Sequence, residues 1–456
     1  MLLVVIGTRP EVIKTAPVIR QLQLNRIPFT LVWSGQHYDY EMSKIFFEEL
    51  SLPEPDIYLE NVKSSADIIS KLSQMIVELK GIVEKVKPEA IYGLGDTSTT
   101  LSAALVAAYE RIPFIHDESG MRSFDLSMIE EVNRLIADRI AALHLSPTKL
   151  AVLNLLSEGI QPCSIKLVGS SLVDVLNNVM ESSLINVGRV RLKKMINVNE
   201  NEHIITLTVH RRENLTCKKL EILSKIIRNI NKLKDFDIKI VFPIHPHTKK
   251  VLEECGLYDK LRRLKGIIFT QPLGYLEFIA LLKDSKIVIT DSGGVQEEAF
   301  ILGKHTITLR NSTEWPETVL LGYNTLVSLE EGAEKLIPDL VKKKLYQELP
   351  VPTLEKSPIG DGRSAIRIAK IIKKFLEEKD HKTCLSKTPY YIPLPFTLDR
   401  SMEHNMIPLS TNDFLTLLAQ DKTNIYIKRV QYNISDLKEN VKIQVEIDWR
   451  SIDDTL

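Results

Sequence analysis

Titratable side chains follow several short apolar runs of this chain, where they could exchange protons with a bound ligand. Asp96 and Glu118 each lie at the end of such a run, and Glu130 comes later in the charged stretch that Glu118 begins. His210 ends another apolar run in the second half of the chain. Carboxylates and imidazoles are the groups that most often act as general acids and bases. Asp96 and His210 are therefore candidates for acid–base chemistry, whereas position alone leaves the role of Glu118 and Glu130 open.

Each of these candidates also has a structural interpretation. Asp96 opens the stretch GDTSTT, and Asp, Ser and Thr are preferred N-caps of helices. A lone histidine is more often structural than catalytic, although Arg211 follows His210 at once. Asp117, the neighbour of Glu118, should point to the opposite side of its strand and have a structural role.

Two turns between a strand and a helix are suited to bind an anion. In TDSGGVQEEAFILGK (290–304), Ser292, Gly293 and Gly294 permit close approach of a phosphate to the backbone, and the helix that follows supplies N–H donors. Glu298 lies farther along this helix, where a carboxylate can accept hydrogen bonds from ribose hydroxyls. The spelling is neither GxGxxG nor a Walker loop, so the ordinary NAD and ATP motifs are absent.

The second such turn is GTRPEVIK (7–14), in which a proline sits where a helix takes its first residue. Arg9 and Lys14 add full positive charges beside the helix N-terminus, and arginine can bind a phosphate through two hydrogen bonds. The alternative is an ordinary turn with surface bases.

The elements that position these residues alternate along the chain. Continuous β-branched runs are typical of parallel strands that are covered on both faces. We expect strands at 2–7, 29–33, 90–95, 113–119, 141–146, 164–169, 203–209, 238–244, 266–271, 286–291 and 305–310. We expect helices at 10–24, 65–86, 99–110, 129–140, 147–158, 216–233, 275–284, 294–302 and 330–345.

This alternation predicts an α/β fold with two doubly wound, Rossmann-like domains that face a central cleft. We place the N-terminal domain at 1–170 and the C-terminal domain at 171–355, followed by a closing helix at 356–379. The stretch 380–456 differs in character, because prolines are followed by two alternating runs. We interpret it as a linker and a small β-rich appendage of unknown role.

The composition excludes several classes of protein. The 456 residues contain 59 Lys and Arg against 59 Asp and Glu, so no global charge draws the chain to nucleic acid or to an anionic membrane. We expect neither a signal peptide nor a membrane span. Four scattered cysteines suggest no disulfide framework and favour a reducing cytoplasm. The HPH at 245–247 lacks a third ligand at a natural spacing, so we expect no metal.

Nine ordered motifs carry a resemblance to a known family. They are GTRPEVIKTAPVI, SGQHYDYEM, GDTSTT, HDESGMRSFD with EEVNR, VHRRENL, QPLGYLEF, TDSGGVQEEA, TEWPE and GDGRSA. Together they resemble the non-hydrolysing UDP-N-acetylglucosamine 2-epimerases over about residues 1–378. The resemblance implies the GT-B fold, a homodimer and a reaction without NAD or metal.

The resemblance also implies a mechanism. A base removes the C2 proton of the sugar while UDP leaves C1, and a glycal is held in the cleft. A proton then returns to C2 from the opposite face and UDP adds back. Matched to this family, Asp96, Glu118, Glu130 and His210 are the acid–base residues.

Other matched positions imply contacts with the substrate. Arg9, Lys14 and Arg134 should stabilise the diphosphate, and Arg211 is also expected to bind the substrate. Ser292, Gly293 and Gly294 match the phosphate cradle, and Glu298 the ribose contact. Gln36 and His37 match a region that binds an allosteric UDP-GlcNAc in some members.

The chain departs from the better-known members at two places. Between Glu118 and Glu130 it is two residues shorter than the commonest bacterial form, and the RSFD spelling resembles archaeal members and those that act on UDP-diacetamido-uronic acids. Trp315 stands where an arginine lies near the nucleotide in others. The alternatives are thus an epimerase of a UDP-diacetamido-uronic acid, a hydrolysing epimerase, a GT-B glycosyltransferase, or a regulator that only binds a nucleotide sugar.

Overall fold

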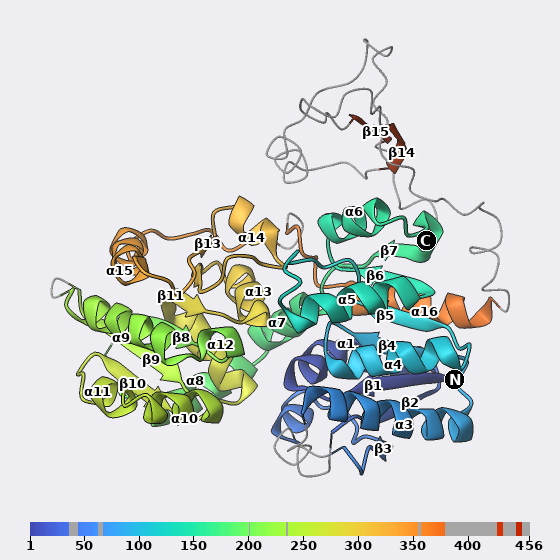
Figure 1. Ribbon diagram of the computed structural model, residues 1–456, viewed down its shortest axis with the longest axis horizontal. Coiled ribbons are helices and arrows are strands. Elements are labelled where there is room, and N and C mark those ends of the chain that lie inside the picture. Colours follow the sequence, from blue (N-terminus) through green and yellow to red (C-terminus); the bar gives the residue numbers. More distant parts are fainter. Residues whose placement is uncertain are drawn as a thin grey trace.

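The computed structural model describes most of the first 378 residues and the backbone of two later strands. The described ranges are 1–35, 44–62, 67–199, 201–233, 236–353, 357–378, 426–431 and 444–448. Two lobes lie side by side, each built on a parallel sheet with helices packed against it (Figure 1). None of the helices in these ranges is long and apolar enough to cross a membrane.

The N-terminal lobe contains a seven-stranded sheet in the order β3-β2-β1-β4-β5-β6-β7. Its strands are β1 (Leu2–Ile6), β2 (Phe29–Trp33), β3 (Ile57–Tyr58), β4 (Ala90–Leu94), β5 (Phe114–Asp117), β6 (Leu143–Ser146) and β7 (Ile165–Leu167). Every pairing in this sheet is parallel, and the central strands β1, β4 and β5 are buried along their whole length. Burial on both faces explains why these strands are apolar without alternation.

The C-terminal lobe contains a six-stranded parallel sheet in the order β10-β9-β8-β11-β12-β13. Its strands are β8 (His203–Thr208), β9 (Ile238–Pro243), β10 (Ile267–Thr270), β11 (Ser285–Thr290), β12 (His305–Thr308) and β13 (Asn324–Leu326). The order reverses beside the first strand of each sheet. Such a switch point is where ligands bind in open α/β sheets, outside the carboxyl ends of the strands.

The helices connect these strands and cover both sheets. Those before β8 are α1 (Arg9–Leu24), α3 (Ile68–Val86), α4 (Ser98–Tyr109), α5 (Ile129–Ile140), α6 (Lys149–Ser157), α7 (Ser171–Glu181) and α8 (Leu184–Met195). Those after it are α9 (Cys217–Asn231), α10 (Pro246–Glu254), α11 (Tyr258–Arg262), α12 (Tyr275–Asp284), α13 (Gly293–Ile301), α14 (Pro316–Leu320), α15 (Ala333–Lys344) and α16 (Ser364–Glu377).

The chain passes between the lobes twice. Helix α7 packs on α1, whereas the next helix, α8, packs on α12 of the C-terminal lobe. After α15 the chain returns, and α16 packs on α1 and α7 of the N-terminal lobe (Figure 1). One cluster of buried apolar side chains contains residues of both lobes, from Leu2 of β1 to Tyr275 of α12.

Some elements differ from the sequence-based expectation. The two short strands β3 and β13 and the helices α7, α8, α10, α11 and α14 were not predicted. In the last stretch of the chain, Tyr426–Gln431 (β14) and Gln444–Asp448 (β15) form an antiparallel pair where alternating runs were noted.

The prediction about the cysteines was wrong. Cys217 at the start of α9 and Cys255 at the end of α10 form a disulfide, with their Cα atoms 5.5 Å apart. Cys163 is disulfide-bonded as well. Spacing in the sequence did not reveal the Cys217–Cys255 pair, because the two helices come together only through the order of strands β8 and β9 in the sheet.

Candidate active site

Glu118 lies immediately after β5 in an unusual backbone conformation. Its φ is +62°, a region that non-glycine residues seldom adopt. The neighbouring Asp117 is buried and accepts hydrogen bonds from the Glu118 N–H at 2.9 Å and from the Tyr92 hydroxyl at 2.5 Å. Burial raises the pKa of Asp117 to about 7. Asp117 thus supports the turn that directs Glu118 out of the strand, a structural role.

Lys14 of α1 joins Glu118 to the other lobe. Its ammonium group donates a hydrogen bond to Glu118 Oε1 and lies 3.0 Å from Oε2 of Glu297 on α13. Burial opposes the charge on Lys14, but the two carboxylates outweigh it and raise its pKa. Burial also raises the pKa of Glu297 to about 7, although Lys14 acts in the opposite direction. The ion pair with Lys14 holds Glu118 in a site where the two lobes meet.

Asp96 follows β4 and lies close to Glu118. A Cβ atom added at Gly95 would lie 3.4 Å from Glu118 Oε2, so the Glu118 carboxylate lies over the turn that precedes Asp96. Asp96 accepts a hydrogen bond from the Arg134 guanidinium, and its backbone carbonyl accepts one from Asn133 at 2.7 Å. The structure therefore brings two of the predicted acid–base residues together at the ends of adjacent strands.

A buried histidine, His116, contacts this turn through its ring. The Nε2 atom of His116 lies 2.8 Å from the carbonyl oxygen of Gly95, and its Nδ1 lies 2.6 Å from Asp138. Both partners are oxygens that accept hydrogen bonds, an arrangement that favours the doubly protonated, cationic form of the ring. Burial opposes this charge, but Asp138 outweighs it and raises the pKa of His116.

Glu130 is the second residue of α5 and faces the C-terminal lobe. Its Oε1 lies 3.8 Å from Nη1 of Arg211, which follows His210. The next residue, Glu131, is buried and accepts hydrogen bonds from the Ser123 hydroxyl and from the N–H groups of Ser123 and Phe124. Glu131 thereby holds the loop between β5 and α5 in place, and Glu130 remains free to face Arg211.

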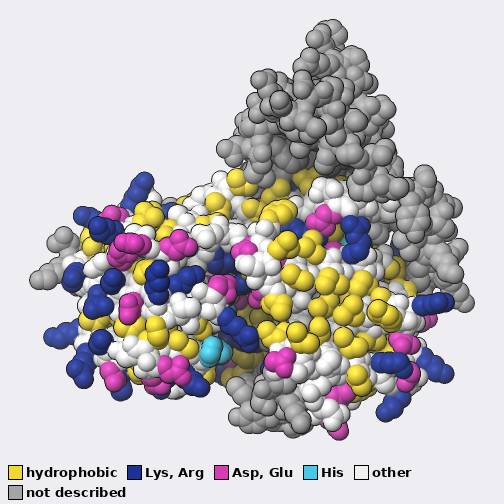
Figure 2. Space-filling model, viewed as in Figure 1, with side chains coloured by type: hydrophobic (Ala, Val, Ile, Leu, Met, Phe, Trp, Pro, Cys, Tyr) yellow, Lys and Arg dark blue, Asp and Glu magenta, His cyan; other side chains and the backbone are white. Residues whose placement is uncertain are grey.

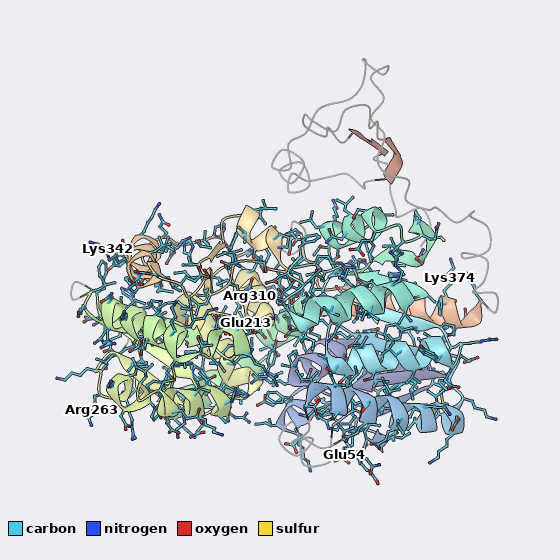
Figure 3. All side chains as sticks on the ribbon, viewed as in Figure 1. Glu54, Glu213, Arg263, Arg310, Lys342 and Lys374 are labelled. Carbon is cyan, nitrogen blue, oxygen red and sulfur yellow. A yellow bond between two sulfur atoms is a disulfide. The ribbon has the colours of Figure 1, made fainter. Side chains whose placement is uncertain are left out.

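Glu314 lies among three arginines that come from both lobes. Its carboxylate is 2.8 Å from Arg310, 3.8 Å from Arg134 and 4.0 Å from Arg211. Burial opposes its charge, but the arginines lower the pKa of Glu314 to about 2. Arg310 is labelled in Figure 3 at the boundary between the lobes. The space-filling view shows charged side chains of both signs along this boundary, where the surface is hollowed (Figure 2).

The predicted phosphate cradle lies at the N-terminus of α13. Ser292 is the N-cap and Gly293 and Gly294 form the first turn, so their N–H groups point out of the end of the helix. A side chain at Gly293 would collide with Glu314, at 1.9 Å from its Oε1, whereas a Cβ atom at Gly294 would meet nothing within 4 Å. The backbone at Gly294 is therefore open to an approaching anion.

Arg9 and Glu298 face one another across the lobes. Arg9 stacks over Phe46 at 4.5 Å and reaches Phe278 at 5.9 Å. Burial lowers the pKa of Arg9, and Glu298 acts in the opposite direction. Burial raises the pKa of Glu298 to about 8, although Arg9 opposes this. At the other predicted anion site, the N–H groups of Gly7 and Thr8 are occupied by the Glu11 carboxylate of the same helix.

His210 lies two residues after the end of β8 and has a buried acidic partner. Its Nδ1 lies 3.3 Å from Asp291, and the imidazole is half-exposed. The Arg211 N–H also donates to Asp291, at 3.0 Å. His210 therefore lies beside the cradle, next to the arginine that faces Glu130.

Sequence reasoning missed four residues of this site, namely Asp291, Glu297, Glu131 and Glu314. Trp315 is buried, and its ring centroid lies 5.6 Å from the Lys14 ammonium, so it contacts the same network. Gln36 and His37 lie outside the described residues. No group of three or more His, Cys, Asp or Glu side chains in the described ranges is placed to hold a metal ion.

Comparisons with known proteins identify the family. The family model described as UDP-N-acetylglucosamine 2-epimerase matches residues 20–373. The UDP-N-acetylglucosamine 2-epimerase of Methanocaldococcus jannaschii is 41% identical over 81% of this chain and 98% of its own length. The UDP-2,3-diacetamido-2,3-dideoxy-D-glucuronate 2-epimerase of Pseudomonas aeruginosa is 34% identical over 82% of this chain and 99% of its own length.

Solved structures agree with these relatives. The M. jannaschii enzyme in complex with UDP-GlcNAc and UDP has a TM-score of 0.74 at 39% identity, covering 82% of this chain and 99% of its own. The Neisseria meningitidis enzyme bound to UDP-GlcNAc has a TM-score of 0.73 at 30% identity, covering 82% and 99%. The expected GT-B fold is thereby confirmed.

Proposed function

The chain belongs to the UDP-N-acetylglucosamine 2-epimerase family, and from this premise we propose that it interconverts UDP-GlcNAc and UDP-ManNAc. The observation that carries the proposal is the meeting of acid–base groups from both lobes beside an open helix N-terminus. Glu118 and Asp96 come from the N-terminal lobe, while His210 and the α13 cradle come from the C-terminal lobe.

The proposed reaction proceeds through a glycal. A base of the site removes the proton from C2 of the sugar while the bond between C1 and the diphosphate oxygen breaks, and that oxygen keeps the electron pair. An acid on the other face returns a proton to C2, and the diphosphate oxygen adds back to C1. The C2 proton is weakly acidic, so both a positioned base and stabilisation of the leaving group are needed.

We assign the roles as follows. Asp96, Glu118, Glu130 and His210 exchange the protons, and we favour Glu118 as the residue whose loss is most severe. Ser292, Gly293 and Gly294 bind the diphosphate with α13, and Glu298 accepts from the ribose. Arg9, Lys14, Arg134 and Arg211 supply positive charge around the leaving group. Support for these roles comes from the ion pairs that gather the same residues where the lobes meet.

We also propose that the enzyme is a homodimer that associates through the N-terminal lobe. Exposed apolar side chains cluster at the start and along one side of α5. They are Phe124, Leu126, Ile129, Val132 and Ile136. Figure 2 shows a broad apolar area on this lobe, and exposed apolar patches of this kind often mark protein–protein contacts. Light scattering should report a dimer that the change Ile129→Asp weakens, and a monomeric wild type would contradict this.

We place the enzyme in the cytoplasm, where it would supply precursors of a surface polysaccharide or glycan. A UDP-sugar substrate supports this location. Disulfides such as Cys217–Cys255 are rare in cytoplasmic proteins, so the proposed location rests on the substrate alone.

Product analysis tests the substrate. The purified protein is incubated with UDP-GlcNAc and, separately, with UDP-2,3-diacetamido-2,3-dideoxy-glucuronate, the substrate type of the P. aeruginosa relative. We expect an equilibrium mixture of UDP-GlcNAc and UDP-ManNAc that is the same from either side. Turnover of the diacetamido-uronate alone would correct the sugar, and accumulation of UDP with free ManNAc would indicate a hydrolysing enzyme.

A further inference from the structure

Asp291 lies where two parallel strands of the C-terminal lobe end together. Thr290 of β11 is paired in register with Thr208 of β8, so the residues that follow them come out of the sheet side by side. The Asp291 N–H donates to the Thr208 carbonyl at 3.3 Å. Asp291 therefore lies under the turn that carries His210, one residue before the phosphate cradle.

Three hydrogen-bond donors and the His210 ring converge on this carboxylate, which is fully buried. The backbone N–H groups of His210 and Arg211 donate to it at 3.1 and 3.0 Å, and the Asn214 side chain donates at 3.2 Å. The fourth contact is an approach at ion-pair distance: Nδ1 of the His210 ring lies 3.3 Å from Oδ1.

The contact with the His210 ring indicates that Asp291 does more than fix the loop through its backbone N–H groups. A neutral oxygen would satisfy the two backbone N–H groups and the amide equally well, without the cost of burying a charge. Within 4.0 Å of Asp291, and among the described residues, the ionisable cation is His210 rather than a lysine or arginine. The buried negative charge thus faces the one ring in this turn that can gain a proton.

We infer that Asp291 is a positioning residue for the epimerisation, holding His210 with Nδ1–H toward itself and Nε2 toward the cleft. A neutral imidazole has one donor and one acceptor nitrogen, and the hydrogen bond of one nitrogen decides which is which. The carboxylate also stabilises the ring when Nε2 takes up a proton during the reaction. The catalytic role of Asp291 rests on the proposed function, whereas the orientation of the His210 ring does not.

The test combines a mutant cycle with a spectroscopic measurement. We expect Asp291→Asn to lower kcat about tenfold to a hundredfold. In the background of His210→Gln, the same change should lower kcat by less than about threefold, because its effect passes through the ring. The matched control is Asn214→Ala, which removes another donor to Asp291 without touching the ring; its kcat should stay within about threefold of wild type.

Two results of the cycle would overturn the inference. In the first, Asp291→Asn lowers kcat by the same factor in the His210→Gln background as in wild type. In the second, Asn214→Ala lowers kcat as much as Asp291→Asn does. Either result would leave Asp291 as a clamp of the loop alone.

The spectroscopic arm needs no turnover. Nitrogen NMR of wild-type protein with labelled histidine, assigned by His210→Gln, should show the Nδ1–H form at His210 when the ring is neutral. The Nε2–H form would refute the inference whatever the kinetic cycle shows. Failure of wild type to turn over UDP-GlcNAc would instead count against the proposed function.

Discussion

The change Glu118→Gln isolates the proton transfer that we assign to this residue. The amide has nearly the shape of the carboxylate but cannot accept a proton from carbon. Lys14 would retain its second partner, Glu297, at 3.0 Å, so the change does not leave a buried ammonium unpaired. The backbone turn at Glu118 is held by Asp117 and does not depend on the side chain.

The expected loss follows from the role. A positioned acid–base group contributes about 10²- to 10⁴-fold in rate, so we expect kcat to fall at least about a hundredfold. That factor corresponds to about 2.7 kcal/mol of transition-state stabilisation. The cradle at Ser292–Gly294 lies on the other lobe and keeps its geometry. The Kd for UDP should therefore stay within about threefold of wild type.

The assay measures epimerisation rates by NMR and UDP affinity by calorimetry on the same preparation. Glu84→Gln is the matched control, because it makes the same acid-to-amide change at an exposed pair with Lys80 on α3. Near-normal turnover in Glu118→Gln would remove this residue from the chemistry. An equal loss of UDP affinity would show instead that the change disturbs the cleft as a whole.

Three further changes test other parts of the structure. Lys14→Met should lower the free energy of unfolding by about 3–5 kcal/mol in urea denaturation, because the buried carboxylate of Glu297 and the partly buried one of Glu118 lose their shared partner; a loss below about 1 kcal/mol would contradict the ion-pair network. Cys217→Ser with Cys255→Ser should lower it by about 4 kcal/mol, since the disulfide closes a separation of 38 residues; unchanged stability relative to oxidised wild type would show that the bond does not constrain the unfolded chain. Burial raises the pKa of Glu317 to about 7 from 4.5, so its stabilising contribution is complete below about pH 4.5 and is lost as the pH rises through 7. Glu317→Gln should accordingly show a flatter dependence of unfolding free energy on pH between 5 and 8, and a curve parallel to that of wild type would refute the assignment.

The sequence was most informative about the strands and the helices that cover them. Strands buried on both faces leave long apolar runs, and α5 (Ile129–Ile140) and α12 (Tyr275–Asp284) have the predicted bounds. The short strand β3 has only two residues and carries no such pattern. Helices α7 and α8 carry the chain from one lobe to the other, a role that depends on contacts with α1 and α12 rather than on local sequence.

Sequence reasoning could locate those residues of the candidate site that are titratable and follow a predicted strand. Asp96, Glu118 and His210 all lie at strand ends, and parallel strands bring their carboxyl ends to one edge. Glu297 and Asp291 were not foreseen, because their roles depend on Lys14 and His210, which are distant in the sequence. A signal existed in each case, since Glu297 precedes Glu298 and Asp291 precedes the Ser-Gly-Gly turn. Glu314 was not foreseen either, because the arginines that stabilise its charge come from both lobes.

The central claim is that a proton leaves C2 and another returns from the solvent-exchangeable groups of the site. Proton NMR of wild-type protein with UDP-GlcNAc in D2O measures this directly. We predict that deuterium enters C2 as the UDP-ManNAc signals grow, with exchange at C2 also in the recovered UDP-GlcNAc. Formation of UDP-ManNAc with the original proton retained at C2, or no exchange and no epimer, would contradict the account.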